Sequence, residues 1–190
     1  MNTKSLLGRI MPAGPLMKEH RIIENMIALL KKEAAGLEAN LNLDTFFISQ
    51  TADFIMTYVD RCHHGKEEHI FFRELEKKNL SKEHSETMGQ LMEEHKEGRI
   101  LLSKLMEAAG RYEKDAEKVK TEALSCLNDL TALYPRHIEK EDMHFFLPCM
   151  NYFSRKEKDD MLEEFWEFDR MLIHEKYRGM VKQLEIRKLK

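Results

Sequence analysis

The stretch that decides the fold is CHHGKEEHIFF, which runs from Cys62 to Phe72. On an α-helix, neighbouring side chains point about 100° apart, so only one of the two adjacent histidines can face a core. The side chains four, seven and eleven residues before His63 are apolar, whereas those before His64 are polar or acidic. We therefore predict that His63 and Glu67, which are adjacent on one helix face, point inward. His64 and Glu68 are expected to pair on the outer face.

The same pattern recurs in RHIEKEDMHFF, residues 136–146. His137 takes the place of His63 and Glu141 that of Glu67, since 137 − 63 and 141 − 67 both equal 74. A histidine and a glutamate buried in an apolar stripe are unfavourable unless they pair with each other or bind a cation. One such pair could be a hydrogen-bonded core pair, but its repetition favours a shared binding site.

Two further histidines stand alone on apolar stripes of helical spacing. His20 lies in MKEHR and His95 in MEEHK, 75 positions later (95 − 20 = 75). The sequence therefore predicts two helical hairpins related by an internal repeat. Each hairpin contributes one lone inward histidine and one inward HxxxE motif.

Composition favours helices throughout the chain of 190 residues, because charged residues make up 34% and apolar residues 42%, with only 8 glycines and 4 prolines. The apolar spacing is helical in five segments, which are 15–39, 45–78, 82–109, 116–147 and 155–188. We predict an all-α fold in which the first four segments form an up-down-up-down four-helix bundle. This bundle would be a metal-binding domain over residues 1–150.

The fifth helix, in residues 151–190, is expected to pack on the bundle or at an oligomer interface, and a homodimer would use the second arrangement. Trp166 and Phe168 are expected to lie in that contact. Pro135 falls within the fourth predicted helix. It removes one backbone hydrogen bond and is expected to kink the helix just before His137.

Charge and cysteine usage exclude several classes of protein. The formal net charge is −3 with both signs interspersed, so no basic face for nucleic acid is expected. No apolar run approaches the roughly 18 residues that span a bilayer, and the first residues lack the apolar core of a signal peptide. The three cysteines have no CxxC spacing, which favours a reducing cytoplasm over a disulfide framework.

Four imidazoles and two carboxylates are thus expected to meet inside one bundle, a number that suits two metal ions. The candidate metal ligands are His20, His63, Glu67, His95, His137 and Glu141. Imidazole suits zinc, copper, iron and nickel, and bridging carboxylates favour iron or manganese. No thiolate joins the set, which disfavours a structural zinc site. The alternative is a plain helical bundle whose buried polar groups satisfy one another.

On these motifs the sequence resembles the hemerythrin-like family, also called the HHE cation-binding family, over about residues 16–150. The resemblance rests on the two lone histidines, on HHGKEE and on HIEKED. It implies two iron ions with an oxo or hydroxo bridge in an antiparallel bundle. The four histidines would be terminal ligands, and Glu67 and Glu141 would be bridging carboxylates.

Two departures from the oxygen-carrying members stand out. Those members place HxxxH on the third helix, whereas here the positions four residues from His95 are Leu91 and Arg99. Those members also end the set with an aspartate five residues after the last histidine, whereas the inward carboxylate here is Glu141, four residues after His137. The pattern is closer to the branch that includes iron–sulfur cluster repair proteins. The N-terminal pair of adjacent cysteines of those proteins is missing from this sequence.

Two functions follow from such a centre. The first is a redox-active protein that handles O2, peroxide, NO or iron itself, with an unknown electron donor; the second is a sensor or store of oxygen or iron, with the fifth helix as its output. Whether the protein is an enzyme is left open, and no catalytic residue is assigned. Tyr58 and Tyr134 are candidate proton or electron donors or packing residues. His144, seven residues after His137, is a candidate fifth ligand or a surface residue.

Apolar neighbours are expected to limit access of water to the centre. The side chains that we expect in this role are Met56, Val59, Ile70 and Phe71.

Overall fold

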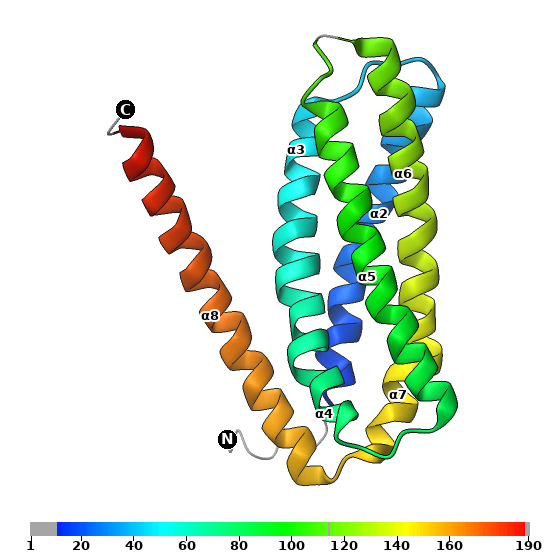
Figure 1. The fold of residues 1–190 in the computed structure, drawn as a ribbon, viewed down its shortest axis with the longest axis vertical. Helices are drawn as coiled ribbons and strands as arrows, with labels where there is room; N and C mark the ends of the chain where they lie inside the picture. Colours follow the sequence, from blue (N-terminus) through cyan, green and yellow to red (C-terminus); the bar gives the residue numbers. More distant parts are fainter. Residues whose placement is uncertain (1–10, 114, 189–190) are drawn as a thin grey trace.

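The structure is a computed structural model that describes residues 11–113 and 115–188, with side chains described as far as residue 172. Throughout these residues the regular secondary structure is helical, which confirms the all-α class. Four helical rods lie side by side, and short connections join successive rods (Figure 1). A fifth helix begins beside one end of the bundle and diverges from it.

Each rod ends within a few residues of its predicted bounds. The first rod is α2 (Ala13–Glu38) and the third is α5 (Lys82–Ala109). The second rod contains α3 (Thr45–Phe54), the π-helical η1 (Ile55–His64) and η2 (Glu67–Phe72), and α4 (Arg73–Glu76). The fourth rod contains α6 (Ala116–Glu139), the π-helical η3 (Lys140–Phe145) and α7 (Phe146–Cys149). A short 3-10 turn, η4 (Met150–Tyr152), then leads to α8 (Arg155–Lys188).

Side-chain caps mark the beginnings of the second, third and fourth rods and of α8. Asp44 accepts a hydrogen bond from the backbone N–H of Phe47, and Ser81 accepts one from that of His84. Ser154 and Glu157 form the reciprocal capping box at the start of α8. These capping residues mark where the chain enters the next helix. Helix α6 continues through Pro135.

Two hydrophobic clusters fill the bundle, one toward each end. The upper cluster, at the end where α2 connects to α3, includes Leu30, Leu105 and Leu130. The lower cluster, at the end where α4 connects to α5, includes Phe71 and Phe145. In each rod, the residues between the two clusters are the polar ones that the sequence places inward. The packing therefore holds a polar layer between two apolar blocks.

Both histidines of the opening stretch are buried, which contradicts the prediction that His64 faces solvent. His63 is 1% exposed and His64 is 3% exposed. They lie at the end of the π-helical η1. A π turn contains more residues than an α turn, so adjacent side chains diverge less and both can face the interior.

Helix α8 packs against the lower cluster through Met161 and Phe165. Phe168 lies over Gly65, where an added Cβ would come within 2.7 Å of the Phe168 ring, so a larger residue there would displace that ring. Trp166 does not pack on the bundle in this way, because its side chain is 51% exposed, and its place at an oligomer interface stays a prediction. Among the described residues, no helix is long and apolar enough to cross a bilayer.

Candidate metal centre

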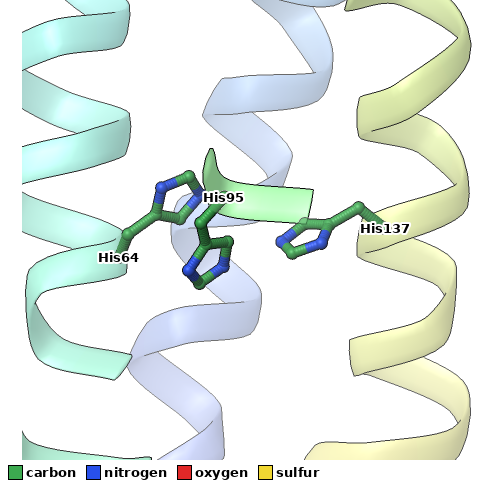
Figure 2. Close-up of side chains that lie close together, drawn as sticks. All are labelled: His64, His95 and His137. Carbon is green, nitrogen blue, oxygen red and sulfur yellow. The ribbon is translucent and has the colours of Figure 1, made fainter. Parts of the chain in front are cut away.

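All six predicted ligands are buried in the polar layer, none more than 3% exposed. Their ligand atoms, with those of His64, form two adjacent groups in which the atoms lie within 4.8 Å of one another. One group contains His20, His63, Glu67 and Glu141. The other contains His64, His95 and His137, whose rings approach one another from three rods (Figure 2).

The two glutamates lie between the groups. One oxygen of Glu67 is 3.2 Å from His63 Nε2 and the other is 3.4 Å from His95 Nε2. Glu141 Oε2 is 3.1 Å from His20 Nε2 and 3.4 Å from His137 Nε2. Each carboxylate therefore reaches a histidine of both groups, as a carboxylate that bridges two ions would.

Each of the four predicted histidine ligands turns its Nδ1 atom toward a carboxylate at 2.7–2.9 Å. The pairs are His20 with Asp142, His63 with Glu19, His95 with Glu68, and His137 with Glu94. A cationic side chain supports each carboxylate in turn: Arg21, Lys66, Arg99 and Lys140, respectively. Such carboxylate contacts fix the orientation and tautomer of an imidazole that binds a metal through its other nitrogen.

Two of these supporting carboxylates are held ionised. Burial alone would raise the pKa values of Glu68 and Glu94, but hydrogen bonds from His95 and Arg99, and from His137 and Lys140, lower both to about 2. The prediction that Glu68 pairs with His64 is therefore wrong, because Glu68 accepts from His95 instead. The negative charge so placed raises the basicity of the imidazoles.

Sequence reasoning missed this outer layer, although the repeat contains its signal. Glu19 and Glu94 precede the two lone histidines at the same 75-residue interval (94 − 19 = 75), and Lys66 and Lys140 repeat at 74 (140 − 66 = 74). Because the same residue types recur at the same interval, the contacts of Glu19 with Lys66 and of Glu94 with Lys140 could have been expected to match.

The inner atoms of the centre fit a metal ion. Both oxygens of Glu67 and Glu141, and Nε2 of His95 and His137, are buried without a hydrogen-bond partner. Such orphaned groups are costly inside a protein. His20 Nε2 and His63 Nε2 are 2.9 Å apart. Because both rings present Nδ1 to a carboxylate, two Nε2 lone pairs would face each other unless a cation or a proton lay between them.

The pKa values of the inner groups indicate which of them bind a proton readily and which stay neutral. Burial lowers the pKa of His63 well below its usual range, which favours the neutral imidazole that binds metals. Burial alone would lower the pKa of His20, but the hydrogen bond with Asp142 and the nearby carboxylate of Glu141 outweigh it and raise the pKa to about 9. Burial and the neighbouring Glu141 raise the pKa of Glu67 well above its usual range.

A family model described as the hemerythrin HHE cation binding domain matches residues 11–147. The chain belongs to the hemerythrin family. No curated protein and no solved structure matches it. Family membership assigns cation binding to the segment that contains the six buried residues, and the match covers the first three rods and the fourth as far as residue 147.

A third group of possible ligand atoms lies outside this centre, at Glu19, Cys62 and Asp169. The ammonium group of Lys66 contacts both carboxylates there, so a cation already occupies the position. Of the two alternatives for His144, a fifth ligand or a surface residue, the structure supports the surface residue, since the side chain is exposed. Among the side chains expected to limit access of water, Val59, Ile70 and Phe71 are buried, whereas Met56 is 40% exposed.

A cavity of about 350 Å³ opens beside the second histidine group of the hemerythrin domain. Its lining includes His64, His95, Arg99 and Tyr134. Tyr134 is buried, and burial raises the pKa of its hydroxyl. Two histidines of this group therefore border an open space.

Replacing Glu94 by alanine is expected to weaken metal binding by about 10- to 100-fold, because His137 loses the carboxylate that orients it. Competition with a chelator of known affinity measures the change. The matched control is Glu93→Ala, since Glu93 is the exposed neighbour and pairs only with Lys96 among the contacts described. Equal affinities of the two variants would contradict a supporting role for Glu94.

Proposed function

We propose that this hemerythrin domain holds two iron ions, joined by an oxo or hydroxo bridge, and uses them to handle O2, peroxide, NO or iron itself. The proposed metal ligands are the six residues expected from the sequence. The observation that carries the proposal is the set of buried, unpartnered carboxylate oxygens and imidazole nitrogens facing one another at the centre. Carboxylate and imidazole ligands together favour iron or manganese.

The protein side chains have distinct tasks in this proposal. His20 and His63 would be terminal ligands of one ion, and His95 and His137 of the other. Glu67 and Glu141 would span the pair. A ferrous pair supplies the electrons for binding or reducing a small oxidant.

The surrounding residues orient the ligands and exclude water. The Nδ1 contacts hold the imidazoles in place. Val59, Ile70 and Phe71, which are at most 1% exposed, keep the centre apolar on the sides that they cover. The up-down-up-down topology and the duplicated hairpin belong to the same proposal, supported by the matched intervals of the ligands and of the residues that support them.

A second candidate function is a sensor or store without turnover, and one set of contacts favours it. Asp169 of α8 contacts Lys66, Lys66 contacts Glu19, and Glu19 contacts His63. A shift of His63 on metal or gas binding would therefore reach the C-terminal helix. The homodimer and the cytoplasmic setting stay predictions, as do the electron donor and the absence of nucleic-acid or membrane partners.

Iron loading with an optical spectrum tests the proposal. We expect about two irons per chain and, after oxidation, the near-ultraviolet absorption of an oxo-bridged ferric pair. Rapid iron-dependent consumption of peroxide or NO would support the redox function. Stoichiometric binding with a change at α8, followed by Trp166 fluorescence, would support the sensor. A chain that binds zinc in preference to iron and gives no such spectrum would contradict both.

A further inference from the structure

His64 is a buried polar side chain at the centre that the six-residue ligand set does not use. It is 3% exposed, and its Nδ1 atom is buried without a hydrogen-bond partner. The closest carboxylate oxygen, on Asp60, lies 3.6 Å away and accepts instead from Arg99 at 2.6 Å. Buried polar groups are normally hydrogen-bonded, so a buried imidazole nitrogen without a partner calls for an explanation such as a bound ligand.

The geometry places this ring against the second histidine group. The His64 ring is stacked on that of His95, with centroids 3.8 Å apart, and its centroid is 5.8 Å from that of His137 (Figure 2). One nitrogen from each of the three rings lies within 4.8 Å of the others. Nitrogen ligands bind transition metals at about 2.1 Å, so all three nitrogens would reach one ion once the His64 ring turns out of its stacked position on His95.

The fold itself does not require histidine at this position. In the repeat, His64 corresponds to Ile138 (64 + 74 = 138), which is buried at 4% exposure. An aliphatic side chain therefore fills the matching position in the other hairpin. The departure from symmetry occurs where one histidine group gains a third imidazole.

We propose that His64 is a third imidazole ligand of the ion held by His95 and His137. This inference rests on the proposed two-iron function. His64 would bind through Nε2, with Nδ1 facing Asp60, which is the orientation that the four other histidines share. In an HxxxH motif on α5, a second histidine would stand at the position of Leu91 or Arg99. Here His64 would supply that imidazole from another rod.

The consequence is an unequal pair of ions. The His95 and His137 ion would have three imidazoles, and the His20 and His63 ion would have two. The open coordination position then lies on the His20 and His63 ion. A small anionic or diatomic ligand would bind there, and His64 would stand between the cavity and the second ion.

The test counts ligated imidazoles in the full chain loaded anaerobically with iron(II). Each imidazole bound through Nε2 carries one Nδ1–H proton, which gives a solvent-exchangeable proton NMR signal shifted by the paramagnetic ion. The inference predicts five such signals for the unaltered chain. His64→Ile, which copies the matching Ile138, should give four signals and weaken binding of one iron by about tenfold or more.

The matched control is His69→Gln, which removes an exposed histidine from the same rod and should leave five signals and both affinities unchanged. Four signals from the unaltered chain would overturn the inference while leaving the two-iron proposal intact. Unchanged signals and affinities in His64→Ile would do the same. A chain that binds no iron would overturn both. The count in the unaltered chain decides the matter even if His64→Ile does not fold.

Discussion

Replacing Glu67 and Glu141 together by glutamine is expected to abolish binding of both metal ions while the bundle stays folded. Both carboxylates are fully buried, and all four of their oxygens lack a hydrogen-bond partner. Glutamine keeps the shape but removes the charge that two cations require. We expect the affinity for iron to fall by more than about a thousandfold, roughly 4 kcal/mol. Elemental analysis after dialysis against excess iron measures the loss.

The metal-free stability separates a binding role from a structural one. Two buried carboxylates close together repel each other, and this repulsion contributes to the raised pKa of Glu67. The double variant should therefore unfold no more easily than the unaltered chain when both are metal-free. Glu76→Gln with Glu139→Gln, two exposed positions on the same rods, is the control and should retain all of its iron. Full iron content in Glu67→Gln with Glu141→Gln would refute the assignment of the bridging ligands.

Lys66→Met is expected to lower the free energy of unfolding by about 3 kcal/mol, measured by urea denaturation in the presence of a chelator. The side chain of Lys66 is 1% exposed and its ammonium contacts Glu19 and Asp169. Methionine keeps most of the aliphatic packing but leaves Glu19, which is 15% exposed, without its cation. Removing one partner of a buried ion pair is far more costly than the pair itself is stabilising.

Lys140, which follows Lys66 by 74 residues, supplies the matched control. Lys140 is the counterpart of Lys66 and contacts Glu94, but its side chain is 24% exposed, and no contact to α8 is described for it. Lys140→Met should therefore cost about 1 kcal/mol or less. Losses of the same size in the two variants would show that burial and the contact with α8 do not distinguish these lysines.

Much of the fold could be predicted from the sequence because its signals are local. Helical spacing located the rods to within a few residues, and Ser81 and Ser154 cap helices as their neighbours in sequence suggest. The position of α8 was harder, because Trp166 and Phe168 look equally suited to packing. Only the three-dimensional path of the helix decides that Phe168 covers Gly65 while Trp166 faces solvent.

The structure brings the six predicted ligands together, as the interval of 74 or 75 residues predicts, and their binding of metal stays a prediction. His64 was misplaced because an angle of about 100° per residue holds for an α-helix, whereas η1 is a π-helix. Hydrogen bonding from i to i+5 leaves no sequence signature as plain as apolar spacing. The roles of Glu19, Glu68 and Lys66 depend on contacts between rods, and the spacing of residues within one helix does not reveal such contacts.

The hydrophobic cluster below the centre continues past the point where the family match ends. Residue 147 is the last one matched, yet Met161 and Phe165 share a cluster with Phe71 and Phe145. A recombinant fragment truncated at that boundary would therefore open an apolar surface to water, and such surfaces promote aggregation. The shortest stretch that preserves this cluster reaches at least to residue 165.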